Sequence, residues 1–160
     1  MKDKILEQLN AQFRDSIDSV NEYRGELTIV VRRSEIGRVC RFLRDDGELS
    51  FDSLRDLSGT DYYRPHDRFE VVYNLYSLKN NCRIRIKVRV DQTDLHVPSV
   101  TDLWPAANWL ERETYDMFGI QFDGHPDLRR IYMPEEFEYH PLRKDFPLMG
   151  IPGSLTLPRK

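Results

Sequence analysis

The chain has 160 residues and a formal net charge of −3, and 39% of its residues are hydrophobic and 32% charged. This composition is too apolar for intrinsic disorder, has no basic excess of the kind that nucleic acids select, and contains no apolar run of transmembrane length, the longest being residues 27–31. The acidic N-terminus lacks the apolar stretch of a signal peptide. We therefore expect one domain, with or without a tail, of cytoplasmic origin, which reaches a membrane only through other proteins.

The first third of the chain predicts two helices and two or three strands. Residues 3–13 carry apolar side chains at helical spacing, and residues 26–32 are rich in β-branched residues typical of a strand. Ser34 is suited to cap a second amphipathic helix, which should end at the Asp-Gly turn of residues 46–47. Residues 50–63 predict one or two further strands.

A β-hairpin is the clearest predicted element. Apolar residues alternate with polar ones over residues 69–75 and again over residues 82–90, and residues 79–81 are suited to the turn. One face of the second strand carries four cations in a row, Arg83, Arg85, Lys87 and Arg89. They could form a platform for RNA, with Tyr73 and Tyr76 available for stacking, but a solvated sheet face is the interpretation that the balanced charge favours.

The last third of the chain predicts a helix followed by an irregular tail. Pro105 suits the first position of a helix over residues 105–118, and Gly119 suits its left-handed end. Six of the nine prolines follow residue 120, together with several aromatic residues. Such a segment cannot form long regular elements, yet it is too apolar for a solvated linker. We therefore predict an α+β domain at residues 1–119, with a small mixed or antiparallel sheet and helices packed on one face, and an extended tail at residues 120–160 that docks on a partner subunit.

The chain lacks the common signatures of dinucleotide, phosphate, serine-hydrolase and zinc-protease sites. Cys40 and Cys82 are 42 positions apart and form no CxxC pair, so they are interpreted as buried core thiols. A metal site at Asp123, His125 and Asp127 is disfavoured, because such close ligands separated by proline rarely converge on one ion. We therefore predict no catalytic, cofactor-binding or metal-binding residues on this chain.

The predicted helix at residues 105–118 carries charges that need partners. Arg112 and Asp116 are four residues apart and could pair along its surface. Glu113 is expected on the apolar side, near Trp109, Leu110 and Met117, where a carboxylate needs a cation such as Arg129 or Arg130. Acid–base catalysis by Glu113 and His125 is a weaker alternative, since no nucleophile accompanies them.

A longer pattern surrounds these charges. It comprises Glu111-Arg112-Glu113, then Asp116-Met117-Phe118-Gly119, then His125 and Arg129, and later His140-Pro141-Leu142-Arg143-Lys144-Asp145-Phe146-Pro147. It resembles the signature of the C subunit of respiratory complex I, the 30 kDa subunit family of the proton-pumping NADH:quinone oxidoreductase. The strict match covers about residues 98–150.

The resemblance implies a protein that carries no flavin, cluster or quinone of its own. Its main partner would be the D subunit of the complex, which lines the quinone cavity, with the B and I subunits and other peripheral-arm subunits nearby, at the cytoplasmic face of the bacterial inner membrane. FMN, iron–sulfur clusters and quinone would reside on other subunits. The family signature and partner interface would comprise Glu111, Arg112, Glu113, Asp116, His125, Arg129, Arg130, Arg143, Lys144, Asp145 and Phe146.

Two alternatives stay open. The same type of subunit occurs in complexes that use coenzyme F420 or ferredoxin and in membrane-bound hydrogenases, and the signature does not separate these from the NADH-dependent complex. The alternative of another class is the RNA-binding module on the cationic strand face.

Overall fold

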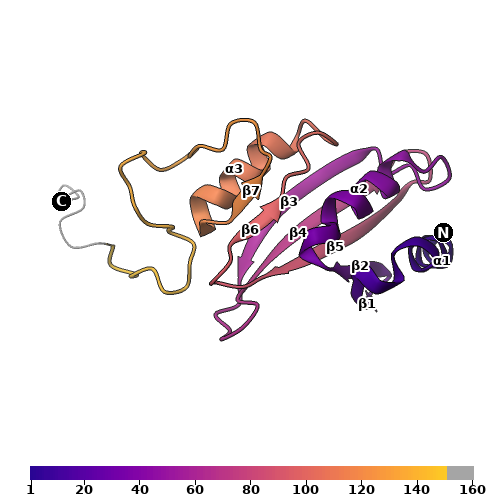
Figure 1. Ribbon diagram of the computed structural model, residues 1–160, viewed down its shortest axis with the longest axis horizontal. Coiled ribbons are helices and arrows are strands. Elements are labelled where there is room, and N and C mark those ends of the chain that lie inside the picture. Colours follow the sequence, from indigo (N-terminus) through magenta and orange to yellow (C-terminus); the bar gives the residue numbers. More distant parts are fainter. Residues whose placement is uncertain (151–160) are drawn as a thin grey trace.

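A five-stranded sheet forms the centre of the computed structural model, which describes residues 1–150 (Figure 1). Its strands are arranged in the order β1-β2-β5-β4-β3, with β2 and β5 parallel and the other neighbours antiparallel. This mixed sheet confirms the predicted α+β class. The strands are β1 Ile17–Tyr23, β2 Glu26–Val31, β3 Ser53–Asp61, β4 Phe69–Ser77 and β5 Cys82–Val90.

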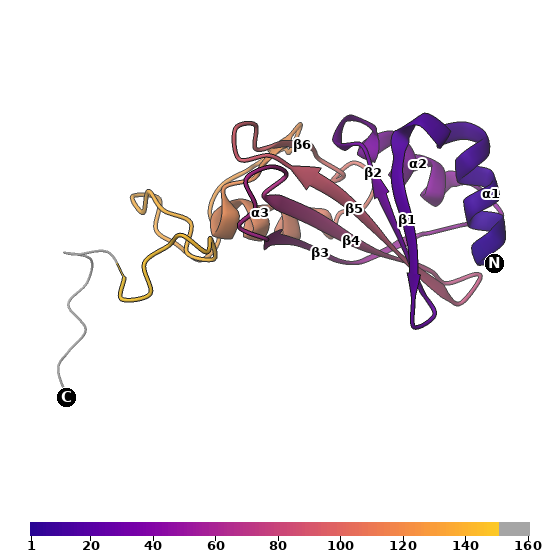
Figure 2. The same cartoon turned by 90° about the horizontal axis from the view of Figure 1, so that it is seen from below.

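Three helices pack on the sheet, α1 Lys2–Phe13, α2 Ile36–Asp45 and α3 Ala107–Phe118. All three contribute side chains to the same buried cluster as the sheet, as predicted, and Figure 2 shows α1 and α2 together on one side of it. The residues predicted to begin α2 and α3 were less accurate than the helices themselves. Ser34 lies in a short 3₁₀ turn, Arg33–Glu35, so it does not cap α2, and α3 begins two residues after Pro105.

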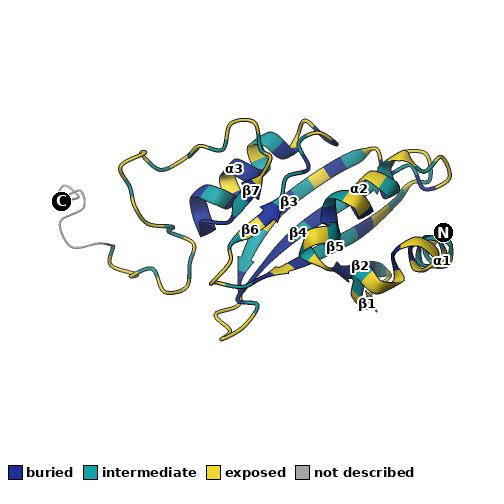
Figure 3. Cartoon of the chain, in the orientation of Figure 1, coloured by how far each residue is buried: buried dark blue, intermediate teal, exposed yellow. Residues whose placement is uncertain are grey.

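The hairpin of β4 and β5 confirms the predicted alternation. Its inward side chains are completely or almost completely buried, and its outward ones are polar or half-buried (Figure 3). Cys40 is fully buried on α2, as predicted, whereas Cys82 is only half-buried at the start of β5, so its prediction as a core thiol was wrong. The inward residues are Phe69, Val71, Tyr73, Leu75, Ile84, Ile86, Val88 and Val90.

Strand β1 is an element that the sequence pattern did not predict. Six of its seven residues are exposed, so it has no alternation of buried and exposed side chains to reveal it. It forms an edge of the sheet by pairing with β2.

A second, two-stranded sheet lies beside α3. Strands β6 His96–Pro98 and β7 Gln121–Asp123 pair in parallel and return the chain to the body after α3. Ile120 and Phe122 are buried in the core, although they follow the predicted domain boundary at residue 119. The boundary itself remains a prediction.

Residues 124–150, which we call the described tail, contain no helix or strand. Figure 1 shows them leaving α3 and looping away from the sheet. Residues 151–160 of the predicted tail lie outside the described residues. Across residues 1–150, no helix is long and apolar enough to cross a membrane.

Candidate functional site

The C-terminal end of α3 is completed by residues of the tail. The last carbonyls of a helix have no partner within it. Here His140 donates from Nδ1 to the carbonyl of Asp116 (2.9 Å), the Leu142 N–H donates to that of Met117 (3.2 Å), and Arg143 donates from Nε to that of Phe118 (2.6 Å). The tail is therefore bonded to the negative end of the helix dipole, where donors and cations are favoured.

Gly119 makes this close approach possible. Its φ of +76° is left-handed, as predicted, and its N–H donates to the Tyr115 carbonyl at 2.7 Å. A Cβ at this position would lie 2.5 Å from Arg143 Nη2 and 2.6 Å from His140 Nε2. Any side chain at residue 119 would therefore force the side chains of Arg143 and His140 to move away from the helix end.

Asp116 is the centre of a second set of tail contacts. Its Oδ2 accepts hydrogen bonds from the backbone N–H groups of residues 131, 132 and 133 at 2.7–3.0 Å, and its Oδ1 accepts one from Arg130 at 2.7 Å. Burial alone would raise the pKa of this fully buried carboxyl, but these donors outweigh it and hold the pKa below its ordinary value. Asp116 is therefore a buried anion that fixes the course of the chain after β7.

A buried ion pair at the end of the hairpin forms the third anchor. Arg68 donates to both oxygens of Asp61, at 3.0 and 2.7 Å, and to Asp145 of the tail at 2.8 Å. The Lys144 backbone N–H also donates to Asp61, at 2.8 Å. Burial would raise the pKa of Asp61, but the hydrogen bonds from Arg68 and from backbone N–H groups lower it to about 2. The tail is thus tied to the sheet as well as to α3.

The charges on α3 have partners that differ from those predicted. Arg112 does not pair with Asp116: it donates to the carbonyls of Arg129 and Arg130, at 3.0 and 3.1 Å, and stacks on Trp109. Glu113 is exposed, so the prediction that it is buried and paired with an arginine was wrong. Trp109 is 62% exposed, so the side of the helix that it marks is not the buried one.

Glu111 is the glutamate that the helix buries. Its carboxyl accepts hydrogen bonds from the Val100 N–H at 2.8 Å and from the Ser99 hydroxyl at 2.7 Å, and so holds the turn before α3. Burial raises its pKa to about 7, with Asp102 adding to the effect, although both hydrogen bonds oppose the rise.

His125 forms a turn and lies apart from Glu113. Its Nδ1 accepts the Asp127 N–H at 3.0 Å, which leaves Nε2 to donate to the Asn108 carbonyl at 3.1 Å. The side chain of Arg129 pairs with Asp127 at the surface. Within residues 1–150, His125 and Glu113 share no hydrogen bond, and no group of three or more His, Cys, Asp or Glu residues could hold a metal ion.

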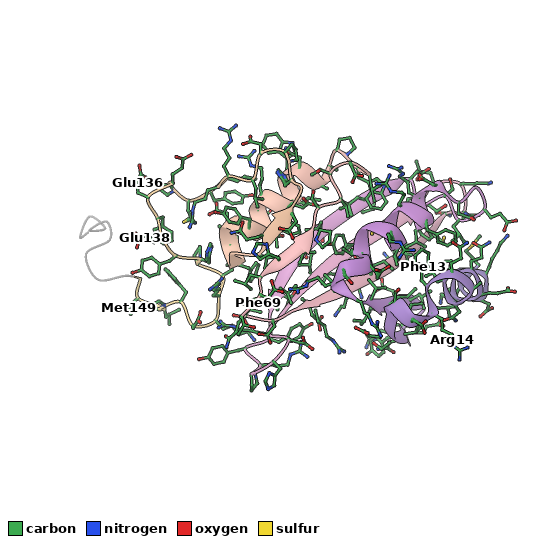
Figure 4. All side chains as sticks on the ribbon, viewed as in Figure 1. Phe13, Arg14, Phe69, Glu136, Glu138 and Met149 are labelled. Atoms are coloured by element: carbon green, nitrogen blue, oxygen red, sulfur yellow. The ribbon has the colours of Figure 1, made fainter. Side chains whose placement is uncertain are left out.

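The remaining predicted interface residues lie on the tail. Phe146 packs with Phe137 and Tyr139, with ring centroids 5.8–6.4 Å apart, while the side chain of Lys144 is exposed. Figure 4 shows Glu136, Glu138 and Met149 on the part of the tail that lies away from the sheet. The exposed apolar residues of the tail are Tyr132, Tyr139, Leu142, Leu148 and Met149, of which Leu148 is fully exposed.

Three residues of this site were absent from the predicted set, namely Asp61, Arg68 and His140. Asp61 and Lys144 are 83 positions apart, so no local spacing could connect them. His140 lies within the later part of the family pattern, and that pattern was the only available signal for it.

Acidic residues of neighbouring strands interrupt the cationic strand face. Lys87 pairs with Glu70 at 2.9 Å, and Arg83 and Arg85 both pair with Glu26, at 2.6 and 3.1 Å. A continuous cationic track for a nucleic-acid backbone is therefore interrupted, which disfavours the RNA-binding alternative.

Comparison with known proteins identifies the family. The profile described as "Respiratory-chain NADH dehydrogenase, 30 Kd subunit" matches residues 29–152. The C subunit of NADH-quinone oxidoreductase from Roseiflexus sp. (strain RS-1) is 56% identical over 90% of this chain and 83% of its own length, and that from Hyphomonas neptunium is 50% identical over 91% and 72%.

Two solved structures are similar. The trypsin-resistant fragment (1–134) of Nqo5 is 36% identical, with a TM-score of 0.69 over 79% of this chain and 98% of that one. A chain of an archaeal membrane-bound sulfane sulfur reductase is 22% identical and shows the same fold, with a TM-score of 0.78 over 92% of this chain and 86% of that one. The chain therefore belongs to the 30 kDa subunit family of the respiratory-chain NADH dehydrogenase, with relatives named as C subunits of NADH-quinone oxidoreductase.

Proposed function

We propose that this chain is a non-redox core subunit of the peripheral arm of the proton-translocating NADH:quinone oxidoreductase. It docks on the D subunit, close to the B and I subunits, and supports the quinone site and the passage of electrons from NADH to quinone. In this proposal the chain has no catalytic centre, and FMN, the iron–sulfur clusters and quinone belong to other subunits. It lies on the cytoplasmic face of the bacterial inner membrane.

One observation carries the docking role. The described tail is fixed at its base by buried polar contacts, yet Leu148 and Met149 are 100% and 95% exposed. A lone domain gains nothing from holding such side chains in water. An interface would recover roughly 25 cal/mol for each Å² of apolar surface that it buries. A segment that is anchored at its base and exposes apolar side chains at its end is suited to bind another protein.

The relatives favour NADH as the electron donor. The curated relatives that we compared are named as parts of NADH-quinone oxidoreductase, whereas the archaeal sulfane sulfur reductase chain shares the fold alone. The F420-, ferredoxin- and hydrogenase-type complexes therefore remain the second candidates. The presence of an NADH- and flavin-binding protein in the purified complex would decide between them.

Charging the exposed end of the tail tests the docking role. In the double variant Leu148→Asp and Met149→Asp, neither change should disturb the fold, because both side chains are almost fully exposed. We expect the tagged variant to lose the D-subunit homologue when it is purified from detergent-solubilised membranes, because burying two carboxylates costs several kcal/mol.

Leu78→Asp is the matched control, since Leu78 is 67% exposed at the hairpin turn, far from the tail in sequence. This control should retain the partner. Recovery of the D-subunit homologue with the double variant at the wild-type level would contradict the proposal.

A further inference from the structure

The face of the sheet opposite the helices carries a pocket that the proposed docking tail does not use. It has a volume of about 370 Å³ and lies across four strands, β2, β3, β4 and β5. We call it the open-face pocket. Its polar lining residues are Glu26, Arg55, Asn74, Tyr76, Arg83 and Arg85, and its apolar ones are Leu27, Leu75 and Ile84.

The lining has more positive than negative charge. Three guanidinium groups surround one carboxylate, that of Glu26, which already accepts from Arg83 and Arg85. Arg55 forms neither an ion pair nor a hydrogen bond within residues 1–150; its guanidinium lies 5.5 Å from the centre of the Tyr76 ring. The pocket therefore has a net charge of about two positive units and one cation with no anionic partner in the described chain.

The strand geometry holds these groups in place. Arg55 lies at the irregularity in the pairing of β3 with β4, between Leu54 and Asp56, and such bulges re-aim a side chain. Tyr76 is fixed by a hydrogen bond from its hydroxyl to Asn81 at 2.5 Å. Arg85 is fixed by Asn74, which accepts from its Nε at 3.2 Å. An incoming anion would meet donors that are already oriented, which reduces the entropy lost on binding.

From this arrangement we propose that the open-face pocket binds a carboxylate side chain on an acidic segment of a neighbouring subunit, with Arg55 as its principal partner and Arg83 as the second. This inference rests on the proposed membership of an assembled complex. Arginine and tyrosine are the residues that most often dominate protein interfaces, and arginine pairs with carboxylates in a two-pronged geometry.

Other anions fit the pocket less well. Glu26 lies in its lining, so a phosphate dianion would meet more repulsion than a single carboxylate would. A nucleic-acid backbone needs cations in continuous order, and Lys87, the next cation along the strand face, is already paired with Glu70. Arg83 is 74% exposed, so the site is open enough for a segment of another protein.

Zero-length cross-linking in the assembled complex tests the proposal. Carbodiimide joins carboxylates to amines but not to guanidinium groups, so the variant Arg55→Lys keeps the charge and makes the site reactive. We expect mass spectrometry to find residue 55 joined to an aspartate or glutamate of another subunit. Arg89→Lys is the matched control, because Arg89 is exposed on the same face of β5 and does not line the pocket. It should give no such product.

A second variant measures the strength of the contact. The double variant Arg55→Gln and Arg83→Gln is expected to weaken retention of the chain in the complex by about tenfold at low salt, and the difference should shrink as salt is added. Cross-links only to acids of the same chain, or none, in a complex that has assembled would overturn this proposal alone. A pocket filled by RNA or free phosphate would give that result. Failure of the wild-type chain to assemble would overturn the proposed function and this inference with it.

Discussion

The body and the described tail of this protein are held by different forces. The body, residues 1–123, has one continuous apolar core that joins three helices and the sheet. Within residues 1–150, no fully buried hydrophobic side chain follows Phe122, and in residues 124–150 only Leu128 and Met133 pack, partly buried, against the core. The tail is fixed mainly by charges and hydrogen bonds at the end of α3 and beside β4.

The difference bears on how each region can be used. Apolar burial is non-directional, so a core tolerates repacking if its volume is kept. Hydrogen bonds to Asp61, Asp116 and the last carbonyls of α3 require particular angles and distances. A segment held in this way has a defined direction even without a core of its own, which is the property that a docking element needs. The following predictions test whether the two regions differ as described.

The largest effect is expected at the buried ion pair of Asp61 and Arg68, the part of the body to which Lys144 and Asp145 of the tail are bonded. Asp61→Ala leaves Arg68 buried without its main partner, and breaking a buried pair costs about 3–5 kcal/mol. Urea unfolding should show a loss comparable to that of a core truncation such as Leu57→Ala, for which about 2–5 kcal/mol is expected. A midpoint for Asp61→Ala within error of the wild type would mean that this ion pair contributes nothing to stability.

The next largest effect is a pH dependence of the free energy of unfolding, which arises from carboxyl groups of the body. Because burial raises the pKa of Glu111 from 4.5 to about 7, its contribution to stability is complete below pH 4.5 and is lost as the pH rises through 7. The loss corresponds to about 3 kcal/mol at most. Asp61 has the opposite sign: its lowered pKa adds stability above about pH 4, which disappears as the pH falls toward 2.

Glu111→Gln tests this sign. The variant keeps an acceptor for the Val100 N–H but does not titrate, so its urea midpoint should change less than that of the wild type between pH 4.5 and 8. Equal changes in both proteins would show that Glu111 has an ordinary pKa.

A smaller effect is expected at Gly119. Gly119→Ala adds a Cβ at a left-handed φ and against Arg143 and His140, and should cost about 1–3 kcal/mol. The control Gly37→Ala lies within α2, where nothing is within 4 Å of the new Cβ, and should stabilise by roughly 0.5–1 kcal/mol. Thermal melts of the two variants should therefore shift in opposite directions. A melting temperature of Gly119→Ala equal to or above that of the wild type would contradict the tight approach of the tail.

The smallest effect is expected at Lys144. Its contact with Asp61 is made by the backbone N–H, and its side chain is exposed. Lys144→Ala should change the free energy of unfolding by less than about 0.5 kcal/mol. A larger loss would show that the ammonium group itself takes part in the anchor.

The sequence predicted the elements whose periodicity is clear. The helix at residues 3–13, the strand at residues 26–32, the hairpin and the left-handed Gly119 all follow from local patterns that burial reinforces. Strand β1 was missed because both of its faces meet water, which erases the alternation of a half-buried strand.

The charged residues were harder to predict. Glu111 and Glu113 are two positions apart and so lie on nearly opposite sides of the helix, and the choice between them depended on whether Trp109 marks the core. It does not, because Trp109 is 62% exposed and stacks with Arg112 at the surface. The partners of Asp61 and Asp116 come from distant parts of the chain, and no local pattern encodes such pairs.

Residues of the tail supply the hydrogen-bond donors for the last carbonyls of α3, and this affects the order in which the chain folds. The carbonyls of residues 116–118 reach their final partners only after residues 140–143 have been synthesised and have turned back. Until then water occupies those positions, and the last turn of α3 is open to fraying. Amide hydrogen exchange at residues 115–119 would therefore report whether the tail is bonded to the end of α3, both during folding and in the assembled complex.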